Sequence, residues 1–271
     1  MINDILHHAF MGAALALLIS PNNRKLFYYI IGAFAGLVPD VTKFIFHDQY
    51  LHSLLIVPFI CIGLAFIVKL VYSSEKYIHL LLLFLLPMLA HLFMDFIDDG
   101  NLLFYPLSTT DFNYSLLNRS TPVIWVVILV ISIIGIIIKK AKLMNKIALA
   151  LIALFLIFQC SSKIMISKEL HSDYPLVNAN YYVIPASQWP WEAHTWRYMI
   201  NSDLFKIDGF VENSLTRKET SFYFTPQIKL QYEVKKWEQH GNVYEILCYD
   251  LFNNNKEVTF QSKDRIVWVQ K

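Results

Sequence analysis

Long apolar segments constrain this chain more than any other feature of its sequence. LHSLLIVPFICIGLAFIVKLVY (51–72) and YIHLLLLFLLPMLAHLFMDFI (77–97) are each long enough to cross the hydrocarbon core of a bilayer as a helix. TPVIWVVILVISIIGIIIKK (121–140) and KIALALIALFLIFQC (146–160) are shorter but strongly apolar. Because lipid offers no hydrogen-bond partners to the backbone, segments of this kind fold as helices. We therefore expect four membrane helices.

Two further segments are weaker candidates for membrane helices. LFYYIIGAFAGLVPD (26–40) is rich in small residues between Gly32 and Gly36, and such residues favour close packing of helices. HHAFMGAALALLIS (7–20) is short, and we expect a partial or re-entrant helix there. The predicted membrane domain is therefore α-helical and polytopic, with four to six helices, and covers residues 1–162.

The chain changes character after the last apolar segment. Although the whole sequence is 56% hydrophobic, residues 163–271 carry 26 charged side chains against 18 in residues 1–162. YPLVNANYYVIPASQWPW (174–191) is expected to be irregular. The rest contains β-branched and aromatic runs separated by turn-like NNN and HGN, which together predict a small β-rich domain over residues 163–271. The runs are TWRYMI, KLQYEVKKW, VYEILCYD, EVTF and RIVWVQ.

The positions of lysine and arginine orient the predicted helices. Four lysines crowd the short loop 139–146, and short basic loops lie on the cytoplasmic side of a membrane. Counting through alternate helices then places Arg24 and Lys76 inside as well, and the loop 98–121 outside. The same count makes the β-rich domain extracytoplasmic.

Unusual polar residues gather on one side of this topology. His7 and His8 begin the segment 7–20, and Asp40 ends the segment 26–40. His47 lies in the loop that follows, and His52 opens the segment 51–72. His91 and Asp95 lie near the end of the segment 77–97. Under the charge-derived orientation all of these ends face the outer side. The orientation does not depend on these residues, so their convergence independently supports a shared site.

His91 and Asp95 are four residues apart, so on a helix they share one face, one turn apart. This spacing suits two ligands of one metal ion, and imidazole with carboxylate suits zinc as well as manganese or iron. A divalent ion would compensate carboxylates that are costly at membrane depth. Two simpler interpretations stay open. His91 and Asp95 could be a hydrogen-bonded pair between packed helices, and Asp40 could be a helix-end group wetted by headgroups.

Basic residues give no sign of a nucleic-acid partner. The net charge is only +2, and no nucleic acid is expected to bind. Lys43 and Arg119 fall on the same outer side as the histidines. Either could hold an anionic substrate group or face phosphate headgroups, and we favour the headgroups. Membrane lipids are therefore expected partners, and protein partners stay open.

Four motifs within residues 1–110 carry a family resemblance. They are H-x-x-x-G (His8–Gly12), L-V-P-D (ending at Asp40), H-x-x-x-x-H-S (His47–Ser53), and H-x-x-x-D followed by G and L-x-x-x-P (His91–Pro106). In their order and spacing they resemble the YdjM-like family of membrane-bound, metal-dependent hydrolases. That family is distantly similar to zinc-dependent phospholipase C and the P1-type nucleases. The chain departs from the family where Asp48 replaces the usual arginine, and where Leu51 and Asp98 replace threonine.

The resemblance implies a metal centre with one or two divalent ions, zinc foremost. The implied ligands are His8, Asp40, His52, His91 and Asp95, with His47 as a further candidate. Asp95 could bridge two ions. Asp40 and His52 are the candidate catalytic residues, and Asp40 could serve as general base.

Hydrolysis is therefore the leading expectation for function. The expected substrate is a phosphoester of a lipid or a lipid-linked compound, at the outer face of a bacterial or archaeal cytoplasmic (inner) membrane that the chain crosses several times. One alternative is a non-catalytic scaffold or sensor, with a structural metal in a closed coordination shell and an outer domain that binds a partner. A transporter is less favoured, because its polar residues would lie nearer the membrane midplane.

Overall fold

The computed structural model forms two compact units, one within residues 1–158 and one that begins at residue 159. The first unit is helical and the second is mostly β-sheet. The structure describes residues 2–21, 24–46, 50–98, 100–118, 121–173, 180–186, 195–201, 205–212, 216–224, 232–250, 254–263 and 269–270.

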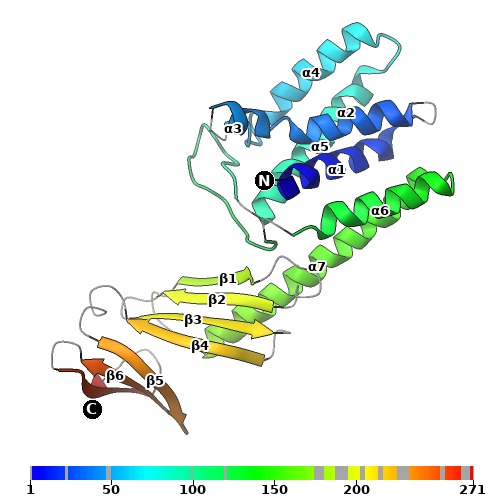
Figure 1. Ribbon diagram of the computed structural model, residues 1–271. Helices are drawn as coiled ribbons and strands as arrows, with labels where there is room; N and C mark the ends of the chain where they lie inside the picture. Colours follow the sequence, from blue (N-terminus) through cyan, green and yellow to red (C-terminus); the bar gives the residue numbers. More distant parts are fainter. Residues whose placement is uncertain are drawn as a thin grey trace. The chain divides into compact units, whose positions relative to one another are not determined.

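Among the described residues, three helices are long and apolar enough to cross a membrane, namely α1, α5 and α7. The prediction of apolar membrane helices is therefore confirmed, but two of the four expected spans, 51–72 and 121–140, form shorter helices. The other apolar helices are shorter, with 13 residues in α2 and 15 each in α4 and α6. In chain order (Figure 1) the helices are α1 (Ile2–Ile19), α2 (Lys25–Leu37), α3 (Asp40–Phe46), α4 (Val57–Val71), α5 (Tyr77–Ile97), α6 (Val123–Ile137) and α7 (Ala141–Asp173).

Three helix boundaries differ from the sequence-based expectation. α1 begins at Ile2 and has 18 residues, so it is longer than the partial helix predicted, and His7 and His8 lie inside it. α4 begins only at Val57, with a proline in its first turn, where proline is favoured. His52 therefore lies in the loop before α4 and does not open the helix. α7 continues far beyond the predicted apolar segment, to 33 residues.

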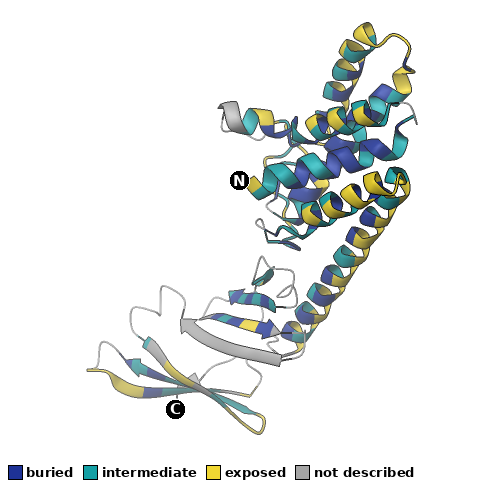
Figure 2. Ribbon diagram, turned by 45° about the vertical axis from the view of Figure 1, so that its right-hand side comes forward, coloured by how far each residue is buried: buried dark blue, intermediate teal, exposed yellow. Residues whose placement is uncertain are grey.

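α1, α2, α4 and α5 share one apolar core. Tyr28, Leu83, Phe84 and Met88 are among its buried side chains. Other apolar side chains of the same helices point outward, and Figure 2 shows exposed positions along these helices. Phe59 on α4 is 75% exposed, for example. An exposed apolar surface of this kind fits contact with lipid tails.

α1 and α2 approach each other closely through glycines. A Cβ atom on Gly36 would lie 2.3 Å from the carbonyl oxygen of His8, and one on Gly12 would lie 2.3 Å from the carbonyl oxygen of Gly32. Larger side chains would force the two helices apart, which is why small residues stand here. The contact brings the beginning of α1 beside the end of α2.

The end of α5 is fixed by the loop that follows it. Gly100 has a φ of +93°, a conformation that favours glycine, and a Cβ there would lie 2.6 Å from the Asp111 carboxylate. The buried Asn101 side chain then donates its Nδ2–H to the carbonyl oxygen of Leu92 at 2.8 Å. Leu92 lies five residues before the end of α5, so this bond ties the following loop to the last turns of the helix.

The second unit contains two antiparallel four-stranded sheets, ordered β1-β2-β3-β4 and β5-β6-β7-β8, so the predicted β-sheet region is confirmed. On β2 the side chains of Trp196, Tyr198 and Ile200 are buried in alternation. The strands are β1 (Asn180–Pro185), β2 (Thr195–Asn201), β3 (Phe205–Glu212), β4 (Thr216–Phe224), β5 (Tyr232–His240), β6 (Val243–Asp250), β7 (Lys256–Ser262) and β8 (Val269–Gln270).

The predicted turns hold, but one predicted irregular segment contains a strand. In the HGN turn, Gly241 has a positive φ angle of 61°. In the NNN turn, φ is 54° at Asn254 and 57° at Asn255. Tight turns between strands require positive φ angles of this kind. The expectation that residues 174–191 are irregular is wrong for β1. Its proline is tolerated because β1 is an edge strand of its sheet and Pro185 is its last residue.

Candidate metal centre

Five of the six predicted metal ligands come together at one end of the helical unit. They come from α1, the start of α3, the loop before α4, and the last turns of α5, and each is at most 7% exposed: His8, Asp40, His52, His91 and Asp95. The sixth, His47, lies outside the described residues. The convergence expected from the sequence is therefore present in the structure for these five side chains.

The nitrogen and oxygen atoms of these side chains face one another at short range. Asp95 is central, because its Oδ1 lies 3.1 Å from His8 Nε2, while its Oδ2 lies 3.2 Å from His52 Nε2 and 3.3 Å from His91 Nε2. Asp40 Oδ1 lies 3.3 Å from His52 Nε2 and 3.8 Å from His91 Nε2. The Nε2 atoms of His52 and His91 are 3.2 Å apart.

These separations fit ligands arranged around a metal ion. Nitrogen and oxygen ligands about 2.0–2.2 Å from a tetrahedral zinc ion lie roughly 3.3–3.5 Å from each other. The observed separations within the cluster bracket that range. Two groups satisfy the spacing of a metal site: His8, Asp40 and His91, and His52, His91 and Asp95.

The tautomer of His91 suits a metal ligand. Its Nδ1–H donates to the carbonyl oxygen of Gly36 at 2.7 Å, and because a carbonyl can only accept, the proton is on Nδ1. The Nε2 atom of a neutral His91 therefore presents its lone pair to the cluster. A second hydrogen bond of this kind orients metal-binding histidines in general.

Hydrogen bonds alone satisfy His52 poorly. A proton on its Nε2 could be shared with only one of three close acceptors, namely Asp40 Oδ1, Asp95 Oδ2 and the lone pair of His91. The buried Nδ1 atoms of His52 and His8 have no hydrogen-bond partner within the described part of the chain. A cation would resolve the crowding of acceptors at Nε2, so the donor set fits a metal better than a purely hydrogen-bonded network.

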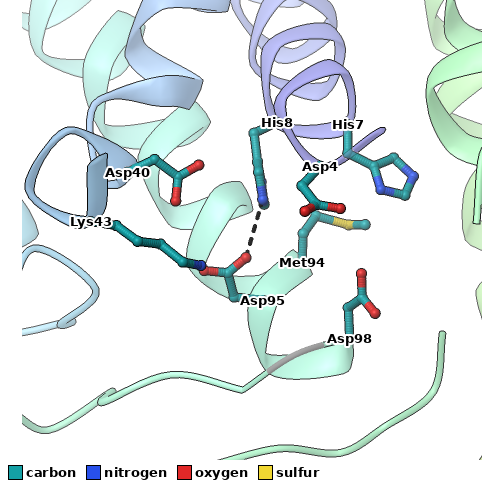
Figure 3. Close-up of a pocket in the computed structure, with 8 residues that line it drawn as sticks. All are labelled: Asp4, His7, His8, Asp40, Lys43, Met94, Asp95 and Asp98. Atoms are coloured by element: carbon teal, nitrogen blue, oxygen red, sulfur yellow. Dashed lines mark ion pairs between the residues drawn. The ribbon is translucent and has the colours of Figure 1, made fainter. Parts of the chain in front are cut away.

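A pocket opens beside the cluster on the side of His8, Asp40 and Asp95 (Figure 3). His52 and His91 do not line it. The remaining lining residues are Asp4, His7, Lys43, Met94 and Asp98. The pocket has space for little more than one water molecule, so it gives water, or a single oxygen atom of a larger ligand, a route to three of the five candidate ligands.

Charge interactions favour an ionised Asp40. Burial raises the pKa of its carboxyl group, but the hydrogen bond from His52 and the neighbouring His91 and His8 lower it more, so the pKa lies below its ordinary value. Asp40 is therefore a carboxylate at neutral pH, as a metal ligand or general base must be.

The cluster lies along the last two turns of α5, its longest helix. α5 runs from Tyr77 to Ile97, so His91 and Asp95 stand four and eight residues beyond its middle. At 1.5 Å per residue these offsets are about 6 and 12 Å along the helix. A substrate path through the midplane, as in a transporter, would place the site closer to the centre.

Two residues that the sequence did not single out for a role support the ligands. Gly36 provides the carbonyl that orients His91. Ser53 follows His52, and its Oγ–H donates to the carbonyl oxygen of Tyr105 at 2.6 Å, which connects the His52 loop to the segment after α5. The same Oγ accepts the Leu55 N–H at 3.1 Å within the loop. The H-S pair in the motif was the only available signal for Ser53.

Comparison with known proteins gives one match. The family described as YdjM inner membrane protein matches residues 3–166, which is more than half of the chain and includes all five clustered side chains. No curated protein and no solved structure matches the chain.

Proposed function

We propose, from the premise that this chain belongs to the YdjM inner membrane protein family, that it is a metal-dependent hydrolase of a phosphoester in a lipid or lipid-linked compound. The observation that carries the proposal is the cluster of three imidazoles and two carboxylates with a pocket beside it. A divalent ion held there would supply Lewis acidity, activating water and neutralising charge on phosphoryl oxygens.

The ligand roles follow from the atoms that face each other. His8 and Asp95 Oδ1 are on one side of the cluster, and His52, His91 and Asp95 Oδ2 are on the other. Asp95 could thus bridge two ions, with Asp40 completing the set. We assign zinc as the first candidate because imidazole and carboxylate ligands suit it.

Asp40 and His52 were both candidate catalytic residues, and their positions suggest different roles. Asp40 lines the pocket, where an ionised carboxylate could accept a proton from water as general base. His52 is only 1% exposed and does not line the pocket, so we propose that it acts as a ligand.

The membrane setting supports a lipid-borne substrate. The cluster lies toward one end of α5, so a headgroup moving laterally in the bilayer would approach it at interface depth. We further propose a multi-pass arrangement in which this end of the helices and the β-sheet unit are extracytoplasmic. The basic residues of the short loops support that orientation.

A structural metal in a scaffold or sensor is the second candidate function, and one observation favours it. Five protein ligands exceed the four that saturate a structural zinc ion, so a single ion here could have a closed shell. Two ions sharing the same ligands would leave positions open for water. The number of bound ions therefore separates the two candidates.

Metal content is the first test. The full-length chain would be purified in mild detergent as wild type, as His91→Ala/Asp95→Ala, and as His240→Ala/Glu257→Ala, a control that removes one imidazole and one carboxylate from exposed positions of the β-sheet unit. Mass spectrometry should find about two metal equivalents in wild type and control, as in two-metal hydrolases, and none in the cluster variant. No metal in a folded wild type would refute the proposal.

Activity is the second test. Metal-loaded wild type would be assayed over lipid phosphoesters in mixed micelles, with His91→Ala as the inactive reference. Turnover that His91→Ala abolishes supports the hydrolase. One tightly bound ion with no turnover over this substrate class would instead favour the scaffold.

A further inference from the structure

We propose that Lys43 is the residue that holds the phosphate group of the substrate beside the metal centre. The inference rests on the proposed hydrolase and deepens it, because it assigns the anion-binding side of the pocket to one side chain. The sequence alone favoured lipid headgroups as the partner of Lys43, and its position in the structure points elsewhere.

The helix α3 places Lys43 on the same side as a metal ligand. Lys43 follows Asp40 by three residues in α3, so the two share one helix face. Both line the pocket, and Figure 3 shows the lysine side chain extending across it toward the Asp95 carboxylate. The ammonium group thus lies at the metal cluster instead of pointing away from the protein.

The charges of the pocket explain why a lysine lies there and under which condition it can bind an anion. Four carboxylates line the pocket, from Asp4, Asp40, Asp95 and Asp98, and Lys43 is the only lysine or arginine among the described lining residues. Without metal, the lysine compensates carboxylates. With one divalent ion the lining stays net negative, and with two it becomes net positive by one charge.

A metal-loaded pocket therefore favours an anion next to Lys43. Two divalent ions take over the compensation of the carboxylates, and the lysine charge then faces the open side of the pocket. Lysine binds phosphate as a flexible point charge, and its four-carbon stem lets the ammonium follow the anion. A phosphate group with one oxygen at the metal centre and another at Lys43 would be oriented for attack on phosphorus.

Orthophosphate binding tests this assignment without requiring turnover. Calorimetry on the metal-loaded, full-length chain would compare wild type with Lys43→Met, which keeps the length and apolar stem, and Lys43→Arg, which keeps the charge. Lys76→Met is the matched control, because Lys76 is exposed and precedes the opposite end of α5. Metal content of each preparation would be measured in parallel.

We expect wild type to bind orthophosphate only when metal is loaded. Lys43→Met should weaken this binding at least about tenfold, in line with the loss of one charge-assisted contact. The orthophosphate affinity of Lys43→Arg should stay within a few-fold of wild type, that of Lys76→Met should be unchanged, and all variants should hold the same amount of metal.

Displacement of orthophosphate by phosphatidic acid in nanodiscs would identify a lipid headgroup as the source of the anion, and failure to displace it would identify a soluble phosphate compound.

Two results would overturn the assignment while leaving the metal centre in place. One is equal phosphate affinity in wild type and Lys43→Met, or no phosphate binding by either. The other is loss of metal from Lys43→Met with retention in Lys43→Arg, which would make the lysine a structural part of the cluster. Failure of the proposed function is distinguishable, because it would appear in wild type itself, which would then lack metal or would hold one ion without turnover.

Discussion

His91 and Gly36 are joined across two helices by a hydrogen bond of 2.7 Å from Nδ1 to the glycine carbonyl oxygen. The same glycine contacts α1, because a Cβ added to it would lie 2.3 Å from the carbonyl oxygen of His8. One backbone position therefore fixes His91 directly and His8 through helix packing. The geometry of the metal cluster depends on how closely α1 and α2 approach.

Gly36→Ala should impair the metal centre without touching a ligand. The added methyl group would push α1 away from α2 and disturb the carbonyl that orients His91, so metal affinity should fall by about 10- to 100-fold, as for other residues that orient ligands. Overpacking should also cost about 1–3 kcal/mol of unfolding free energy. Competitive titration with a zinc chelator and thermal unfolding would measure both.

Gly63→Ala is the matched control for this substitution. Gly63 lies in α4, and nothing would come within 4 Å of an added Cβ. The change should leave metal affinity unaltered. Equal metal affinity in Gly36→Ala and wild type would show that the helix contact does not set the geometry of the cluster.

Ser53→Ala should loosen the loop that carries His52. The variant loses the Oγ hydrogen bond to the Tyr105 carbonyl and the acceptor for Leu55 N–H. We expect metal affinity to fall by roughly tenfold, since His52 remains but is less well positioned. Ser108→Ala, which removes a half-buried serine whose hydroxyl donates to the Thr110 hydroxyl, should have no effect in the same chelator titration. An equal loss in both variants would contradict a specific role for Ser53.

The sequence predicted the helical part well where hydropathy alone decides the structure. The apolar run 77–97 is α5 to the residue, because nothing but helix satisfies its backbone in lipid. The sequence-based prediction was wrong where local contacts decide the structure. Ser53 and Pro58 delay the start of α4, and β1 forms because its backbone pairs with β2, although its own sequence looks irregular.

The candidate ligands could be picked out from the sequence, whereas the residues that position them could not. His91 and Asp95 are recognisable because charged groups are rare in apolar segments and their spacing puts them on one face. Gly36 acts through a backbone carbonyl, and Lys43 acts through the direction of a flexible side chain. Neither property is encoded in a pattern of residue types, so both required the three-dimensional arrangement.

The stability that the Asp40 carboxylate gives to the metal-free protein should be lost in acid. Its pKa in the folded state is lowered, so its stabilising contribution is complete above the unfolded-state pKa of about 3.9 and is lost as pH falls through the lower folded value. The difference in unfolding free energy between wild type and Asp40→Asn should therefore shrink below about pH 4. Denaturant unfolding of chelator-treated protein from pH 6 to pH 3 would measure it.

Asp111→Asn is the control for this pH series, because Asp111 is an exposed aspartate that is not part of the cluster. Its effect on unfolding should be small at every pH. If the penalty of Asp40→Asn stayed constant from pH 6 to pH 3, its ionised form would not be the source of the stabilisation.

Glu75 should stabilise the helical unit without contributing to the metal centre. It is buried just before α5, and along that helix it is separated from His91 by about 24 Å and from Asp95 by about 30 Å. Its carboxylate accepts from the Arg24 guanidinium at 2.9 Å and from the buried Tyr28 hydroxyl at 3.2 Å. Glu75→Ala leaves that hydroxyl without its acceptor, which should cost about 1–3 kcal/mol of unfolding free energy. Metal content should match wild type, and loss of metal would show that the two ends of the unit are coupled.

Glu257→Ala, at an exposed ion pair with Lys235, should change stability little, because solvent screens that pair.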